Sequence, residues 1–165
     1  MNWYTPDKEF LNYLREKDKR IPNTDYGDGK YKPFFGELFE VDGLVYITQV
    51  SHPKDRHKKM KNSKDFLKVY DDKDNFIAVI NLNYMFPIQR ELLEKLDYQK
   101  ININNDANNY ISLLKKELKA IDKMEVDEKA KYIYNLKCNY PNNKISKRCL
   151  DFKALEEHAK KYNKA

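Results

Sequence analysis

The sequence predicts a single α+β domain in which a block of antiparallel strands precedes a block of helices. Three observations predict it. The chain has 165 residues, of which 41% are hydrophobic, so it fits one domain and can bury a core. Two hairpin patterns lie between residues 34 and 82, and helical periodicity dominates after residue 88. Several short antiparallel strands in so small a chain tend to curl into a half-open barrel with helices packed over it, and we expect that architecture.

The N-terminal segment predicts a strand followed by a helix. Residues 2–5 suit a short strand. Thr5 is a candidate N-cap, and Pro6 suits the first helical position because its missing N–H needs no partner there. The basic run of residues 15–20 ends the helix. Its apolar face is supplied by Phe10, Leu11, Tyr13 and Leu14.

Two hairpins follow a long loop. Residues 21–33 are rich in Pro, Gly, Asn and Asp and predict the loop. Residues 34–41 and 44–50 predict strands joined by Asp42-Gly43, since both turn positions accept a positive φ. The second strand must end at Pro53, which cannot donate to a β-ladder. Beyond it, residues 55–64 predict a loop or short helix.

The second hairpin leads into the helical part of the chain. Residues 66–70 and 76–82 predict its strands, and residues 83–87 predict a short extended exit. Helical spacing of apolar residues then predicts helices over 92–96, 107–121 and 128–138. A last helix over 151–162 is expected to be capped by Asp151.

The charge balance favours a polyanionic partner. The chain carries 32 Lys and Arg against 26 Asp and Glu, for a net charge of +6 and a pI near 9.0. A basic surface attracts nucleic acid because neutralised phosphates release counterions.

Two cysteines, Cys138 and Cys149, make neither a disulfide framework nor a metal site. No secretory signal or membrane span is visible, so we expect a cytoplasmic protein with no membrane association. We also expect no cofactor.

The strongest candidate for chemistry is the run Ser51-His52-Pro53-Lys54 at the end of a predicted strand. RNA can be cut without a metal when its 2′-OH attacks the adjacent phosphorus and the 5′-oxygen leaves. That reaction needs a proton acceptor, a proton donor and charge stabilisation. His52 could act as acid or base, Lys54 could bind the phosphate or protonate the leaving oxygen, and Ser51 could hydrogen-bond a phosphoryl oxygen. The alternative is an exposed turn of ordinary polar residues.

Two basic segments flank this run. Lys30, Tyr31 and Lys32 lie in the loop before the first hairpin and could supply a cation and a stacking surface for a base. The second segment is predicted to follow RNA phosphates and consists of Arg56, His57, Lys58, Lys59 and Lys61. Solvated charge without a partner is the alternative for both.

Other catalytic and metal-binding patterns are missing. Asp71, Asp72 and Asp74 lack the glycine and terminal glutamate of a calcium loop and are interpreted as turn residues. The chain has no P-loop, no G-x-S-x-G and no H-E-x-x-H.

Several segments, in the same order along the chain, resemble those of the ToxN/AbiQ toxins of type III toxin–antitoxin and phage abortive-infection systems. The C-terminal run of Cys149 with Leu155-Glu156-Glu157 is consistent with them too. Five earlier segments carry the resemblance: Trp3-Tyr4-Thr5 with Phe10-Leu11-Asn12-Tyr13-Leu14; Ile21-Pro22-Asn23; Lys32-Pro33-Phe34-Phe35-Gly36; Val50-Ser51-His52-Pro53-Lys54 with His57; and Ile80-Asn81-Leu82-Asn83-Tyr84-Met85-Phe86-Pro87-Ile88.

This resemblance implies a half-open antiparallel barrel of the Kid/MazF type and a metal-independent endoribonuclease that cleaves adenine-rich RNA to a 2′,3′-cyclic phosphate and a 5′-OH. It implies catalytic roles for Lys32, Ser51 and Lys54. The family's second hydroxyl corresponds to His52, which either takes part in proton transfer or lines the pocket. The family's functional loop tyrosine corresponds to Tyr26 or to Tyr31.

The resemblance also implies partners. It predicts an antitoxin RNA pseudoknot that the toxin processes from a repeated precursor and then retains in a closed hetero-oligomer of alternating protein and RNA. Cellular or phage mRNA would be the substrate. A non-catalytic RNA-binding module, and an interaction protein independent of nucleic acid, remain as alternatives.

Overall fold

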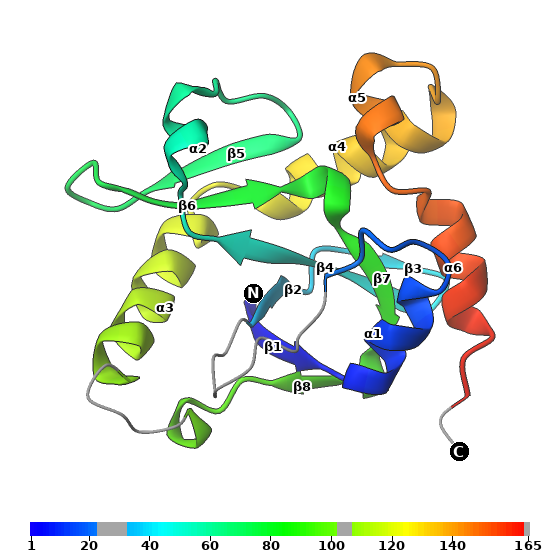
Figure 1. Cartoon of the computed structure of the whole chain (residues 1–165), viewed down its shortest axis with the longest axis horizontal. Helices are drawn as coiled ribbons and strands as arrows, with labels where there is room; N and C mark the ends of the chain where they lie inside the picture. Colours follow the sequence, from blue (N-terminus) through cyan, green and yellow to red (C-terminus); the bar gives the residue numbers. More distant parts are fainter. Residues whose placement is uncertain (23–32, 102–106, 164–165) are drawn as a thin grey trace.

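The computed structural model describes residues 1–22, 33–101 and 107–163 (Figure 1). In this part of the chain an eight-stranded antiparallel sheet is surrounded by helices. The strands are β1 (Asn2–Pro6), β2 (Phe34–Gly36), β3 (Glu40–Val41), β4 (Leu44–Ser51), β5 (Phe66–Tyr70), β6 (Phe76–Asn81), β7 (Phe86–Gln89) and β8 (Leu93–Lys95). The helices are α1 (Lys8–Arg15), α2 (Asp55–Lys59), α3 (Ala107–Asp122), α4 (Val126–Asn139), α5 (Lys144–Arg148) and α6 (Phe152–Lys160), with 3₁₀ turns η1 (Leu82–Tyr84), η2 (Arg90–Leu92) and η3 (Tyr98–Lys100).

Strand β4 organises the sheet. Its first half pairs with β3 and β7, and its second half pairs with β2 and β6. The main order is β5-β6-β4-β2-β1-β8, and every pairing is antiparallel. The α+β class is therefore confirmed. Over the described ranges the order ends at β5 and β8 without closing, so the half-open barrel is not confirmed.

The two predicted hairpins are present, and their turns follow local chemistry. Asp42 and Gly43 have φ of 49° and 81°, as a two-residue turn between twisted strands requires. In the second turn the Asp71 carboxylate accepts hydrogen bonds from the backbone N–H groups of Lys73 and Asn75, both at 2.9 Å. The backbone bond from Asn75 contributes most to lowering the pKa of Asp71. Asp71 is thus a turn residue, as predicted.

Two local predictions near the N-terminus and residue 92 are wrong for one reason. Pro6 is the last residue of β1 and pairs with Leu93, so the N-cap of α1 is Asp7, which accepts from the Phe10 N–H at 2.9 Å. The predicted helix over 92–96 is replaced by strand β8. The Leu96 N–H also donates to the Trp3 carbonyl at 2.9 Å. Pairing between segments about 90 residues apart therefore overrides the local helical spacing.

The remaining differences are at element boundaries. Residues 37–39 interrupt the first predicted strand, and η1 precedes β7 where an extended exit is predicted. Helix α4 starts at Val126, after Glu125 in a left-handed conformation with φ of 53°. Helix α5 is not predicted, whereas α3 is confirmed. In α6 the Asp151 side chain accepts from the Ala154 N–H at 3.2 Å, as a cap.

The core is held between the sheet and the C-terminal helices. Helix α6 packs against β7 and contacts α1, beside β3 in Figure 1. Here the hydroxyls of Tyr46 and Tyr134 both donate to Oε2 of Glu156, at 2.5 and 2.7 Å. All three residues are buried. A carboxylate beneath the surface is therefore satisfied by two hydroxyls and joins β4 to α4 and α6.

Gly36 is required where β2 lies beside its antiparallel neighbour β4. A Cβ at this position would lie 2.8 Å from Cγ2 of Ile47 and 3.3 Å from the carbonyl oxygen of Tyr46. Both neighbours belong to the buried central strand, so neither has room to move. We expect Gly36→Ala to lower the free energy of unfolding by about 1–3 kcal/mol, the usual range for overpacking. Urea denaturation measures this change. Gly43→Ala is the control that separates crowding from backbone strain, because a Cβ at Gly43 would have no atom within 4 Å although the residue has a positive φ. Unchanged stability in Gly36→Ala would contradict the close packing.

Candidate active site

The exit of β4 presents the predicted catalytic run from a fixed backbone. Ser51 is the last residue of β4, pairs with Val79 of β6 and is half-buried. Pro53 is half-buried as well, whereas His52 and Lys54 are exposed. The sheet therefore anchors one end of the run and leaves an imidazole and an ammonium in contact with solvent.

The other end of the run is anchored by His57. The Lys54 N–H donates to Nδ1 of His57 at 2.8 Å, and the His57 N–H donates back to the Lys54 carbonyl at 2.9 Å. Lys54 is thus the N-cap residue of α2, although it has no capping side chain. The reciprocal bonds satisfy an N–H that the start of a helix otherwise leaves without a partner.

His57 lies beneath the basic surface to which the sequence assigns it. The residue is only 4% exposed, and the centroid of its ring lies 5.7 Å from that of Phe66. Burial lowers the pKa of His57, and the positive charges of Arg56, Lys54 and Lys68 lower it further. Because Nδ1 accepts from Lys54, the neutral ring carries its proton on Nε2. Nε2 cannot then also accept from Nε of Arg56, 3.4 Å away, so that contact joins two donors.

The remaining predicted cations of this segment are exposed on or just after α2, namely Arg56, Lys58, Lys59 and Lys61. The ion pair between Lys58 and Asp55 spans 3.6 Å, with both side chains largely in water, so it neutralises little. Lys68 of β5 approaches the same helix, where its Nζ donates to the Lys58 carbonyl at 3.3 Å. The structure therefore extends the basic surface from α2 onto β5.

Four predicted residues, Tyr26, Lys30, Tyr31 and Lys32, lie outside the described residues. The chain enters β2 immediately after them. Phe34 pairs with Gln49, two residues before Ser51. The start of β2 is thus next to the end of β4.

An ion pair that the sequence analysis did not identify holds the segment after α2. Arg148 donates to both oxygens of Asp65, from Nε at 2.6 Å and from Nη2 at 2.7 Å. Ser63 adds a bond of 2.8 Å to the same carboxylate. Burial raises the pKa of Asp65, but the bonds from Arg148 and Ser63 outweigh it, so the pKa is lowered overall. No local pattern links positions 83 residues apart, so the sequence carries no signal for this pair.

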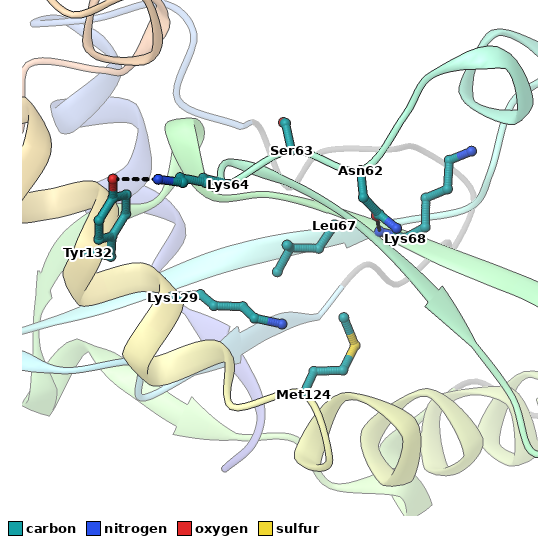
Figure 2. A pocket seen from close by; sticks show the side chains of 8 residues that line it. All are labelled: Asn62, Ser63, Lys64, Leu67, Lys68, Met124, Lys129 and Tyr132. Carbon is teal, nitrogen blue, oxygen red and sulfur yellow. Dashed lines mark hydrogen bonds between the residues drawn. The ribbon is translucent and has the colours of Figure 1, made fainter.

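A pocket beside the basic surface was also missed. It has a volume of about 580 Å³ and lies between β5 with the segment before it on one side and α4 with the turn between α3 and α4 on the other (Figure 2). The lining residues are Asn62, Ser63, Lys64, Leu67, Lys68, Met124, Lys129 and Tyr132. Lys129 and Tyr132 are three apart and so share a helix face, but only the fold brings that face to β5.

Among the described residues no group of three or more His, Cys, Asp and Glu side chains is placed to hold a metal ion. Within the same residues no helix combines the length and the apolar character needed to cross a membrane.

Comparison with known proteins gives a consistent result. Residues 2–160 match the family model described as toxin ToxN of type III toxin–antitoxin systems. The chain is 29% identical to the endoribonuclease ToxN of Pectobacterium atrosepticum, over 99% of this chain and 95% of that protein. It is 24% identical to the endoribonuclease ToxN of Bacillus thuringiensis subsp. kurstaki, over 99% of this chain and 89% of that protein.

Solved structures share the fold over almost the whole chain. One, from work on a processed non-coding RNA that regulates a bacterial antiviral system, superposes with a TM-score of 0.83 at 26% identity, covering 99% of this chain and 100% of the other. AbiQ, a lactococcal anti-phage endoribonuclease of a type III toxin–antitoxin system, has a TM-score of 0.80 at 17% identity and covers 96% and 95%. At that identity the second likeness concerns the fold alone.

Proposed function

The chain belongs to the ToxN family of type III toxin–antitoxin toxins, and from this premise we propose that it is an endoribonuclease that cuts adenine-rich RNA without a metal. The observation that supports the proposal most is the extent of the family match, which runs from residue 2 to residue 160 and includes the β4 exit. The two relatives named endoribonuclease ToxN match over 99% of this chain.

The proposed reaction is an internal transfer of the phosphoryl group. The 2′-OH loses its proton to a base, the 2′-oxygen bonds to phosphorus, and the bond from phosphorus to the 5′-oxygen breaks. The 5′-oxygen takes up a proton. A 2′,3′-cyclic phosphate and a 5′-OH result, and the charge on the phosphoryl oxygens needs donors in a fixed position.

The β4 exit offers suitable groups for these steps. The backbone of Ser51 is fixed by its pairing with Val79, and in our proposal its hydroxyl donates to a phosphoryl oxygen. Lys54 is held by His57 and either neutralises the phosphate or protonates the leaving oxygen. His52 is exposed beside them and either transfers a proton or lines the pocket. Lys32, which lies outside the described residues, supplies a second cation in our proposal.

We further propose that a folded antitoxin RNA inhibits the enzyme. Related work describes selective inhibition of such a toxin by a non-coding RNA pseudoknot. The exposed cations of α2, with Tyr26, Lys30 and Tyr31, would contact the phosphates and bases of this RNA. The toxin would process the repeated precursor and remain bound in a closed assembly of alternating protein and RNA. Substrates would be cellular or phage mRNA, in the cytoplasm.

A chelation experiment tests the activity. Purified protein is incubated with end-labelled adenine-rich RNA in excess EDTA, and the products are tested for a cyclic phosphate by acid hydrolysis. Cleavage that persists in EDTA supports the proposal. Binding without cleavage would instead favour a non-catalytic RNA-binding module, which the exposed lysines of α2 also suit. If the protein neither binds nor cleaves the RNA, an interaction protein independent of nucleic acid is the remaining alternative.

The His57 bond to Lys54 predicts a specific dependence on pH. The folded pKa of His57 is lowered, so the unfolded chain takes up the proton first as pH falls. The stabilisation is complete above the unfolded pKa of about 6.5 and declines below it, because protonated Nδ1 cannot accept from Lys54. We expect His57→Leu to cost about 1 kcal/mol at pH 8, as for a lost cap.

The matched variant is His57→Asn, whose Oδ1 replaces Nδ1 as acceptor without titrating. Urea unfolding across pH 5–8 should show wild type losing stability relative to His57→Asn as pH falls. RNA cleavage measured alongside should fall more in His57→Leu than in His57→Asn, since only the first releases Lys54. Parallel pH profiles of wild type and His57→Asn would contradict this role.

A further inference from the structure

The pocket between β5 and α4 continues the basic surface of α2. Lys68 connects the two, since its Nζ bonds to the Lys58 carbonyl and its backbone N–H donates to Oδ1 of Asn62 at 2.8 Å. Asn62 and Lys68 both line the pocket, and Figure 2 shows them on the side where α2 lies. A strand of RNA that leaves Lys54 along α2 therefore reaches this pocket without crossing a negative side chain of its lining.

The lining combines positive charge with apolar surface. Three of its eight residues are lysines and none is acidic. Leu67 and Met124 supply the apolar part, from opposite sides of the pocket. Lys129 extends from α4 across the pocket toward Met124, and within the described residues it makes no ion pair. The volume of about 580 Å³ falls in the range of small-molecule sites and suits one nucleotide.

Tyr132 closes one end of the pocket with an exposed aromatic ring. The residue is 45% exposed, which is high for a large aromatic side chain. Lys64 orients the ring, because its Nζ lies 2.8 Å from the Tyr132 hydroxyl and 4.6 Å from the ring centroid (Figure 2). An exposed aromatic ring beside cationic side chains is the usual means of binding an unstacked base of a single strand.

We propose that this pocket binds one unpaired nucleotide of an RNA strand that extends from the β4 exit along α2. Its base stacks on Tyr132 and contacts Leu67 and Met124, and its phosphate is neutralised by Lys129. The ammonium of Lys68 points toward α2 and contacts the strand on that side instead. This inference rests on the proposed function, since it makes the pocket an outer subsite of the same RNA-binding surface. The subsite orients the RNA relative to Lys54 and favours strands that are unpaired on one side of the cut.

The test measures binding of a fluorescent adenine-rich RNA made uncleavable by 2′-deoxy nucleotides. Tyr132→Ala should weaken binding about 5- to 150-fold, the range for one lost stacking contact. Lys129→Gln should reduce the slope of log affinity against log salt by about 0.7, as for one lost contact to a single-strand phosphate. Matched controls are Tyr140→Ala, an exposed tyrosine at the end of α4, and Lys131→Gln, whose lysine faces Glu128 at 3.7 Å. Both should bind like wild type.

An abasic scan of the RNA locates the nucleotide. One abasic position should weaken binding to wild type but not to Tyr132→Ala. Parallel titrations with a linear RNA and a folded pseudoknot RNA show whether substrate, antitoxin or both use the site. The subsite would be overturned if Tyr132→Ala and Tyr140→Ala weakened RNA binding equally. It would also be overturned if an oligoglutamate peptide, and no RNA, lost affinity in Tyr132→Ala. Neither result would affect the conclusion drawn from cleavage in EDTA. Conversely, Tyr132-dependent RNA binding without any cleavage keeps the subsite and removes the enzyme.

Discussion

Replacement of Lys54 by alanine is expected to lower the rate of RNA cleavage about 100- to 10,000-fold, the range for losing a proton donor or a charge-stabilising group. The backbone of Lys54 is held by two bonds to His57, and its side chain is exposed. The substitution therefore removes an ammonium and leaves the fold in place. Single-turnover cleavage of labelled RNA measures the effect, and urea denaturation should show a change within about 0.5 kcal/mol.

The matched control is Lys58→Ala, which removes another exposed lysine from α2, in the same basic surface. It should weaken RNA binding slightly and leave the rate at saturating protein near that of wild type. A Lys54→Ala protein that cuts RNA as fast as wild type would show that the active site lies elsewhere. Equal losses in Lys54→Ala and Lys58→Ala would reduce Lys54 to one phosphate contact among several.

Two further measurements separate the roles of Lys54. Arginine can bind a phosphate but does not give up its proton, so activity restored in Lys54→Arg indicates phosphate binding. An RNA in which sulfur replaces the 5′-bridging oxygen needs no proton on departure, because a thiolate is a good leaving group. If Lys54→Ala cuts this RNA at the wild-type rate, Lys54 is the acid. For His52, a pH–rate profile without a limb near neutrality, unchanged in His52→Ser, would exclude proton transfer.

Replacement of Glu156 by alanine is expected to lower the free energy of unfolding by about 3–5 kcal/mol. The Glu156 carboxylate accepts from the buried hydroxyls of Tyr46 and Tyr134. Burial raises the pKa of both phenols, and the bond to Glu156 raises it further, so both stay protonated and donate. Alanine leaves two donors without an acceptor and opens a cavity between β4, α4 and α6.

Because that loss is a large part of a typical domain's stability, milder variants accompany it. Glu156→Gln keeps one acceptor oxygen and should cost about 1–2 kcal/mol, the scale of a weakened bond to a charged group. In a double-mutant cycle with Tyr46→Phe, the two changes should be clearly non-additive, since the partners share one bond. Urea denaturation with an unchanged slope measures each variant. Additive effects, or a stable Glu156→Ala protein, would mean that the cluster contributes little.

Several features were predictable because they depend on neighbours in the chain. The Asp42-Gly43 turn and the Asp151 cap each follow from one or two side chains acting on their own backbone. Helix α3 follows from its spacing of apolar residues. The run from Ser51 to Lys54 could be identified as a candidate because its members are consecutive and adjoin a proline that ends the strand.

Other features were decided only by contacts between distant segments. The leucines of residues 92–96 have helical spacing, yet pairing with β1 makes them a strand. His57 belongs by sequence to a basic run, yet its ring is buried and anchors Lys54. Tyr46 and Glu156 are 110 positions apart, and the pocket joins residues 62–68 to residues 124–132. The sequence by itself thus determined the two hairpin turns, the Asp151 cap and the position of the candidate run, because those features depend on neighbouring residues. Burial, the β8 pairing and the pocket depended on which surfaces the folded chain brings together.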